Sequence, residues 1–97
     1  MIGRGIDQAL HSPLPPELRE PVVRDARDYL RLAERAGGAL SLPMAPDEPW
    51  GELVALREEE RPHLFIANLE TSVTTSDEFW PGKDIHYRAN PENLEVL

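Results

Sequence analysis

The chain has 97 residues, with 18 acidic against 10 basic side chains and a formal net charge of -8. This length allows one small domain, residues 1–97, and the acidic balance argues against an extended contact with the phosphate backbone of nucleic acid. No cysteine occurs, which excludes disulfides, thiolate metal sites and cysteine nucleophiles, so any metal must be held by oxygen and imidazole ligands.

The sequence predicts no membrane segment. No apolar run approaches the roughly 18 residues needed to cross a bilayer, and the start of the chain lacks the charged-then-apolar layout of a secretion signal. We therefore expect a chain without a membrane span, cytoplasmic by default and with its location otherwise open.

The first part of the chain predicts a short helix and a long one. A Gly-Arg-Gly stretch allows tight backbone turns before a helical turn over residues 6–10, and three prolines make residues 11–16 irregular. Pro21 then suits the first position of a helix. Apolar residues recur every three or four positions from there to the glycine pair at residues 37–38, where we expect this helix to end.

The middle of the chain predicts a second helix followed by a buried strand. Asp47 is a candidate N-terminal cap for a helix over residues 50–59, which has a narrow apolar face. Residues 63–67 are predicted to form a short strand buried on both faces, because four apolar residues follow one another without alternation. A helix followed by a strand is typical of α/β proteins.

The last part of the chain predicts a polar loop, a brief strand and the start of a helix. Residues 71–84 are rich in hydroxyl groups, so we expect a surface loop of the kind that carries function, and residues 85–88 are a candidate strand. Asn90, Pro91 and Glu92 match the cap, first-turn proline and first-turn acid of a helix. The order of elements favours an α/β fold that is part of a layered domain.

Two oxygen-bearing side chains follow the predicted strand. Ligands in open α/β sheets gather beyond the carboxyl ends of strands, where Asn68 and Glu70 lie. An amide and a carboxylate two residues apart would point to one side of an extended chain, and both are hard donors suited to Mg²⁺, Mn²⁺ or a similar divalent ion. The alternative is that Asn68 bonds its own backbone in a turn and that Glu70 faces solvent.

Three basic side chains are candidates for binding an anionic group. Arg4 stands between two glycines, Lys83 lies in a Pro-Gly-Lys-Asp stretch, and Arg88 lies near the end of the chain. Glycine permits close approach of a ligand, and a guanidinium can bind two oxygens at once. The alternative is that all three are ordinary surface cations.

The other residue types point to fewer sites. The histidines, His11, His63 and His86, are far apart and lack a close-spaced ligand pattern, so structural or exposed roles are expected. Trp80 is the better candidate for a ligand contact, because Trp50 heads an amphipathic helix and is expected to cover the core. No nucleophile-elbow serine and no Gly-Lys-Ser/Thr loop occurs, which excludes the serine hydrolase and nucleotide-loop classes.

Several stretches, taken in order, resemble the N-terminal part of the CapA-type capsule and poly-γ-glutamate synthesis proteins. The resemblance is carried by MIGRGIDQ, LPPELREPVVRDARDYLRLAE, PWGELVAL, RPHLFIANLETSVTTS and PGKDIHYRANPENLEVL. It implies a calcineurin-like metallophosphoesterase fold, a layered α/β sandwich, in proteins that make or handle an anionic capsule polymer.

This family pattern is met only in part. The family's Gly-Asp before Gly-Arg-Gly and its later Asn-Asn-His stretch are absent here. We therefore expect a partial sandwich that lacks the first strand and the C-terminal two-thirds, arising either from a misplaced start codon with a truncated frame or from gene decay. The resemblance assigns Asn68 and Glu70 to the rim of a metal site.

The leading hypothesis is a part of a CapA-like domain that is inactive alone. In full-length relatives a divalent metal such as Mn²⁺ or Mg²⁺ is the implied cofactor, and we do not expect this chain to retain it. The implied partner is an anionic polymer or its precursor, contacted by Arg4, Lys83 and Arg88, while nucleic acid is not expected as a partner. Whether the chain is an enzyme stays open, and the alternatives are a non-catalytic interaction module or a gene relic.

Overall fold

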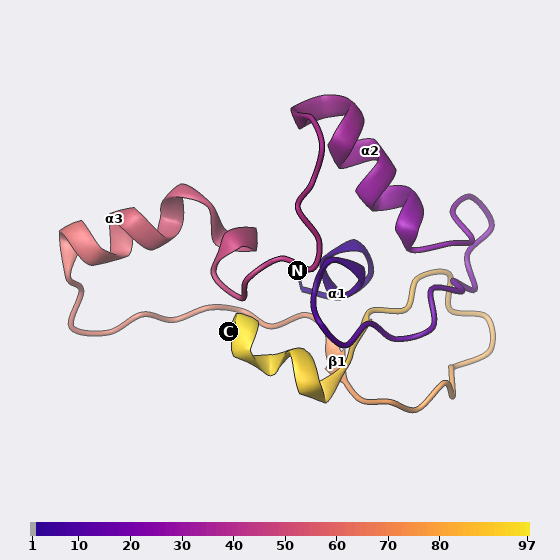
Figure 1. Cartoon of the computed structure of the whole chain (residues 1–97). Helices are drawn as coiled ribbons and strands as arrows, with labels where there is room; N and C mark the ends of the chain where they lie inside the picture. Colours follow the sequence, from indigo (N-terminus) through magenta and orange to yellow (C-terminus); the bar gives the residue numbers. More distant parts are fainter. Residues whose placement is uncertain (1) are drawn as a thin grey trace.

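The fold consists of short helices and one small sheet. The computed structural model describes residues 2–97. Helices and parallel strands in one chain confirm the α/β class, and over those residues the sheet has two strands. Figure 1 shows α2 and α3 extending away from the centre of the molecule, where α1, β1 and the C-terminal helix gather. The elements in chain order are α1 (Gly5–Ala9), α2 (Arg27–Gly37), the 3-10 helix η1 (Glu48–Trp50), α3 (Glu52–Glu60), β1 (Ser72–Val73), β2 (Arg88–Ala89) and the 3-10 helix η2 (Pro91–Val96).

The sheet joins two parallel strands that are distant in sequence. Ser72 lies opposite Arg88 and Val73 opposite Ala89. The Ser72 amide donates to the Tyr87 carbonyl at 3.0 Å, and the Thr74 amide donates to the Ala89 carbonyl at 3.1 Å. Parallel strands need a long crossover, which the polar residues 74–87 supply without a helix. The strand predicted at residues 85–88 is observed slightly later in the chain, as β2 at Arg88–Ala89.

The two ends of the described chain form the core together. Gly3 leaves no space for a side chain, because a Cβ there would lie 2.8 Å from the Arg88 carbonyl oxygen. Gly5 is similarly confined, with the Tyr29 Cβ 2.7 Å from the position of its own missing Cβ. The glycines of the Gly-Arg-Gly stretch thus permit close packing against β2 and α2. The core cluster contains Ile2, Leu10, Ala89 and Val96, with Ile6 packed against it.

A buried carboxylate fastens these two ends. Asp7 is only 1% exposed. Its two carboxylate oxygens accept hydrogen bonds from the Leu14 amide, the Asn90 amide and the Asn93 side-chain amide, each at 2.8 Å. The Asn93 oxygen in turn accepts from the Ser12 amide at 3.1 Å. Buried polar groups need such partners, and here they hold η2 against α1.

Helix α2 begins later than predicted. It starts at Arg27, so the predicted start at Pro21 is wrong, while the predicted end at the glycine pair is confirmed. The residues before it form a turn in which the Leu18 amide donates to the Arg24 carbonyl at 2.8 Å. Those backbone groups are therefore committed to the turn and are not available for a helix.

Asp25 fastens the start of α2 through Arg27. Its Oδ1 accepts from both the Arg27 backbone amide and the Arg27 Nε, each at 2.9 Å. The side-chain hydrogen bond from Arg27, aided by the backbone one, lowers the pKa of Asp25 from 3.8 to about 2. The carboxylate is thus held in its charged form at the first turn of the helix, where negative charge is favourable.

Helix α3 is confirmed close to the predicted range, but its predicted cap is wrong. Asp47 precedes η1 and makes no side-chain cap hydrogen bond. Instead, the Glu48 carboxylate accepts from the Ala45 amide at 2.7 Å. The apolar face of α3 stays partly open, with Leu56 49% exposed.

The predicted buried strand at residues 63–67 is wrong. This segment has no strand assignment, and Leu64 and Ile66 are 73% and 81% exposed. Figure 1 shows it as an extended run between α3 and β1. A strand buried on both faces needs neighbouring strands and covering layers, whereas β1 and β2 pair with each other further along the chain.

The C-terminal helix begins as predicted. The Asn90 side chain accepts from the Glu92 amide at 3.1 Å, which confirms it as the cap, and Pro91 takes the first position. The helix is of the 3-10 type.

The helices are short, α2 having 11 residues. In the part of the chain that the structure describes, none has the length and apolar character required to cross a membrane.

Candidate functional site

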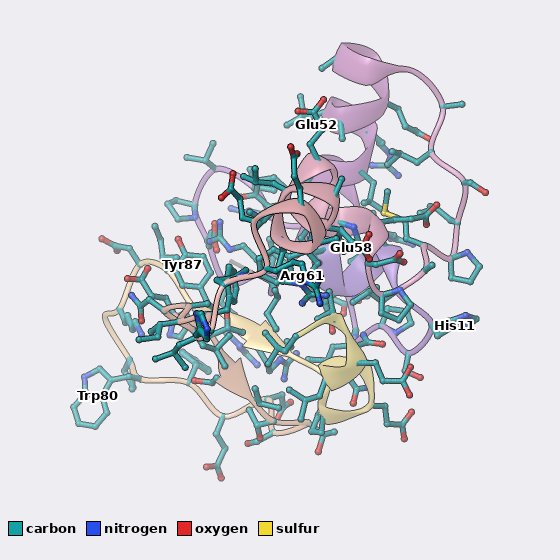
Figure 2. All side chains as sticks on the ribbon, turned by 90° about the vertical axis from the view of Figure 1, so that its left-hand side faces the viewer. His11, Glu52, Glu58, Arg61, Trp80 and Tyr87 are labelled. Carbon is teal, nitrogen blue, oxygen red and sulfur yellow. The ribbon has the colours of Figure 1, made fainter. Side chains whose placement is uncertain are left out.

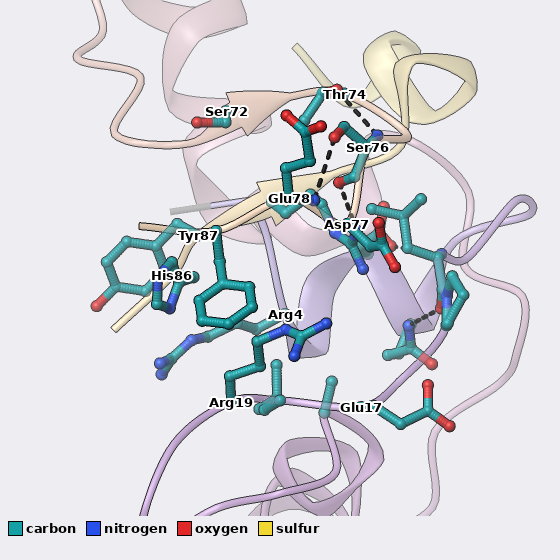
Figure 3. Close-up of a pocket in the computed structure, with 18 of the residues that line it drawn as sticks. Arg4, Glu17, Arg19, Ser72, Thr74, Ser76, Asp77, Glu78, His86 and Tyr87 are labelled. Carbon is teal, nitrogen blue, oxygen red and sulfur yellow. Dashed lines mark hydrogen bonds between the residues drawn. The ribbon is translucent and has the colours of Figure 1, made fainter. Parts of the chain in front are cut away.

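Residues 2–97 enclose a cavity of about 650 Å³, which we call the main cavity. Its walls come from α1, from residues 14–19 and from the crossover that precedes β2. Figure 3 shows Ser72 and Thr74 along one side, Glu17 and Arg19 along the opposite side, and Arg4 between them. The cavity is lined by four basic side chains, Arg4, Arg19, Lys83 and Arg88.

The structure brings the three predicted anion-binding residues to this one cavity. Arg4, Lys83 and Arg88 all line it, although they are spread over most of the chain. Arg19 was not singled out from the sequence, because it lies in a proline-rich stretch with no local pattern that marks a site. Four of the ten basic residues of an acidic chain thus share one cavity.

Lys83 and Arg88 are two cavity cations whose donors are largely uncommitted. Within residues 2–97 neither forms an ion pair. The Arg88 Nη1 donates to the Ser76 carbonyl at 2.5 Å, which leaves its other N–H groups available. Lys83 follows Gly82, whose φ of 80° requires glycine, and its amide donates to the Trp80 carbonyl in a tight turn.

Arg4 is held by aromatic and acidic neighbours. Its guanidinium carbon lies 5.5 Å from the centre of the Tyr29 ring and 4.7 Å from that of the Tyr87 ring. The Nη1 donates to the Tyr29 hydroxyl at 2.7 Å, and the Nη2 pairs with the Glu20 carboxylate. Arg4 directly precedes α1, and its φ of 56° is uncommon for a residue with a side chain.

Phe79 and its neighbours form another part of the wall of the main cavity. The guanidinium of Arg19 lies 4.0 Å from the centre of the Phe79 ring. His86 meets the same ring edge-on, with the centroids 5.7 Å apart. Both ring nitrogens of His86 are shielded from solvent and have no hydrogen-bond partner among the described residues. No sequence pattern indicates that His86 lies beside the predicted cations.

Acidic and hydroxyl groups complete the lining. Asp7 faces the cavity with a carboxylate already committed to three hydrogen bonds, and Glu17, Asp77 and Glu78 are exposed. The Thr74 hydroxyl accepts from the Ser76 amide at 3.0 Å and thereby shapes the loop. The lining is therefore of mixed charge, and it offers donors for carboxylates beside acceptors for N–H groups.

Asn68 and Glu70 lie outside the main cavity. Their side chains point to one side of the extended segment, where the Asn68 Nδ2 donates to the Glu70 Oε1 at 2.9 Å. Both residues are exposed, and the structure does not bring them together with the cations. In residues 2–97 no three His, Asp or Glu side chains are placed to hold a metal ion. Their role as metal ligands stays a prediction.

The two tryptophans differ as predicted in exposure. The Trp50 indole donates to the Val96 carbonyl and is partly buried. Trp80 is 77% exposed, and Figure 2 shows it projecting from the edge of the molecule. It does not line the main cavity, so a ligand contact by Trp80 remains a prediction.

The fold and the cavity define a small α/β chain with a candidate site for an anion. The chain belongs to the family described as bacterial capsule synthesis protein PGA_cap, whose sequence pattern matches residues 1–97. It is 44% identical, over all 97 residues, to proteins of two strains of Mycobacterium tuberculosis, each named a probable polyglutamine synthesis accessory protein. The chain spans 26% of the length of these relatives. No solved structure gave a significant match.

Proposed function

We propose that this chain supplies an anion-binding cavity to a capsule-polymer synthesis accessory protein, and that the ligand is a glutamate-containing polymer or its precursor. This proposal is supported most directly by one observation: a single cavity of an otherwise acidic chain is lined by Arg4, Arg19, Lys83 and Arg88. Charge-assisted hydrogen bonds from such groups are the usual way to hold a carboxylate.

The family membership supports a capsule polymer as the ligand, and the cavity cations favour the charged glutamate form of such a polyamide. Capsule synthesis is the function in the family description, and the relatives are named for the synthesis of a polymer of glutamine. Because the chain spans 26% of those relatives, activity, substrate and partners of the whole protein are part of the proposal. We propose that binding, and not catalysis, is what residues 1–97 contribute.

The mixed lining suits a polyamide better than a bare polyanion. A glutamate polymer presents carboxylates separated by amide groups. Lys83 and Arg88 would take carboxylates, while Glu17 and Glu78 would accept hydrogen bonds from amide N–H groups. A phosphate chain has no N–H groups to donate to the acidic residues of the lining.

We also propose the layered metallophosphoesterase-like sandwich as the fold of the longer relatives, with Asn68 and Glu70 contributing to a divalent-metal site there. A bound divalent ion would polarise a phosphate-like or acyl centre. In this chain the two side chains offer one free carboxylate oxygen and one amide oxygen, while the amide nitrogen already bonds the carboxylate. Two donors are too few for the six-ligand shell of such an ion, so we derive no catalytic step from them.

Calorimetry with variants tests the cavity. Lys83→Ala and Arg88→Ala should each weaken binding of oligo-γ-glutamate by about tenfold, because a hydrogen bond to a charged group contributes on the order of 1.5–3 kcal/mol. Arg35→Ala, an exposed cation outside the cavity, is the matched control and should bind as the unmodified chain does. Equal affinities for all three variants would refute the assignment.

A second candidate function is a non-catalytic interaction module. The apolar run of Leu64, Phe65 and Ile66 favours it, because all three side chains are at least half exposed. Exposed apolar runs with unpaired backbone are common association sites. Sedimentation of the unmodified chain and of Ile66→Lys separates the two functions, since only the module requires this run for association.

A further inference from the structure

The guanidinium of Arg4 forms an ion pair with a carboxylate of its own chain. Its Nη2 pairs with the Glu20 Oε1, and the two side chains are only 14% and 9% exposed. Arg4 lines the main cavity, whereas Glu20 does not, so the acid reaches the guanidinium from behind the cavity wall. One of the four cavity cations is therefore already neutralised by a glutamate.

The niche around Arg4 has the features of a built carboxylate site. The rings of Tyr29 and Tyr87 flank the guanidinium, and the Tyr29 hydroxyl accepts a hydrogen bond from the Arg4 Nη1. These contacts fix the orientation of the planar group. A guanidinium oriented in this way can present two parallel N–H groups to one carboxylate.

Glu20 satisfies this site incompletely. The Arg4 Nε and Nη2 and the Glu20 Oε1 are shielded from solvent and form no hydrogen bond among residues 2–97, although Nη2 and Oε1 form an ion pair. The Nε and one terminal nitrogen of a guanidinium lie on the same edge and together suit the two oxygens of a carboxylate. A carboxylate able to approach that edge squarely would make two hydrogen bonds, and it would also satisfy a buried donor that is costly to leave unpaired.

The segment that carries Glu20 is a surface turn. Its base is closed by the antiparallel bridge between Glu17 and Asp25 and by the hydrogen bond from the Leu18 amide to Arg24. Its tip is open, with Val22 89% exposed. Movement of the tip would withdraw Glu20 while leaving the core contacts of α1 and η2 in place.

We infer that the Arg4 niche is a carboxylate subsite of the main cavity and that Glu20 occupies it until a glutamate unit of the ligand takes its place. The inference rests on the proposed function for the identity of the ligand. Glu20 offers the same carboxylate that a glutamate polymer repeats along its length. A ligand carboxylate and the Glu20 carboxylate then compete for Arg4. Removing Glu20 must therefore raise the affinity of the chain for the ligand.

The test compares Glu20→Ala with the unmodified chain. Glu20→Ala should bind oligo-γ-glutamate about tenfold more tightly, a size typical of coupling between competing contacts. Propionate, which replaces the missing carboxylate, should raise the melting temperature of Glu20→Ala more than neutral propionamide does. Glu34→Ala, which removes an exposed acid that neither lines the main cavity nor pairs with Arg4, is the matched control and should show neither effect.

A measurement on the unmodified chain covers the case in which Glu20→Ala does not fold. The Arg4 Nε–H resonance, assigned with Arg4→Lys, should shift on addition of oligo-γ-glutamate. An unmoved resonance, or equal ligand affinity of Glu20→Ala and the unmodified chain while Lys83→Ala loses binding, would overturn the subsite and leave the proposed function intact. No binding by any of these proteins would overturn the proposed function itself.

Discussion

Replacement of Asp7 by alanine is expected to release the C-terminal helix from the rest of the chain. The carboxylate is buried and receives three N–H groups, from Leu14, Asn90 and Asn93. Alanine offers none of them a partner. Asn90 and Asn93 would lose their hydrogen bonds to the Asp7 carboxylate, and η2 would be held by its apolar contacts and by the hydrogen bonds of Asn90 and Asn93 with Ser12.

The size of the loss follows from the three orphaned donors. Each buried donor left without a partner costs about 1–3 kcal/mol, and the sum is offset in part because a buried charge is removed and water can enter. We expect a net loss of about 3 kcal/mol in the free energy of unfolding. Domains of this size are stable by roughly 5–15 kcal/mol, so the chain should fold but with a large reduction in stability.

Urea unfolding followed by circular dichroism measures this loss. With a slope of about 1.5–2 kcal/mol per molar urea, Asp7→Ala should lower the midpoint by about 1.5–2 M. Asp47→Ala removes an exposed carboxylate without a cap hydrogen bond and should change the midpoint little. A midpoint for Asp7→Ala within about 0.5 M of this control would show that the buried carboxylate does not join the two ends.

Three further predictions test other parts of the structure. Arg27→Ala should raise the pKa of Asp25 from about 2 towards 3.8, as followed by NMR titration. In the unmodified chain the folded-state pKa of Asp25 is the depressed one. The stabilisation of the fold by the Asp25–Arg27 pair is therefore present above about pH 4 and is lost as the pH falls towards 2. Ile66→Ser should change the free energy of unfolding by less than about 0.5 kcal/mol because Ile66 is 81% exposed, whereas Val96→Ala, at a position 2% exposed, should cost more than about 1 kcal/mol. Mn²⁺ should raise the melting temperature of the unmodified chain no more than that of Glu70→Gln, and a rise confined to the unmodified chain would contradict the view that two donors are too few.

Local signals in the sequence predicted local structure well. The Asn90 cap and the glycine pair that ends α2 were predicted correctly, because both depend on the conformation of a few neighbouring residues. The start of α2 was predicted too early because Pro21 fits two local structures equally well. The turn over residues 17–25 prevails through hydrogen bonds that a helical pattern does not reveal.

The main errors concern contacts between distant residues. An apolar run such as residues 63–67 predicts a buried strand only if other strands lie beside it, and that condition is not written in the run itself. Asp7 was overlooked because its partner Asn93 lies 86 positions away. The sequence indicates the candidate cations one at a time, through glycine neighbours and arginine chemistry. Only the structure shows that they line one cavity together with Arg19, and that Glu20 pairs with Arg4.

The proposed function requires the main cavity to recognise the carboxylates of a glutamate polymer. The most direct test is calorimetric titration of the unmodified chain with oligo-γ-glutamate and, separately, with oligoglutamine of the same length, at about 20 mM and about 200 mM salt. We predict binding of the charged oligomer that weakens as salt rises, with little binding of the neutral one. Equal binding of both oligomers, or an affinity for glutamate that salt does not change, would contradict recognition of carboxylates by these cations.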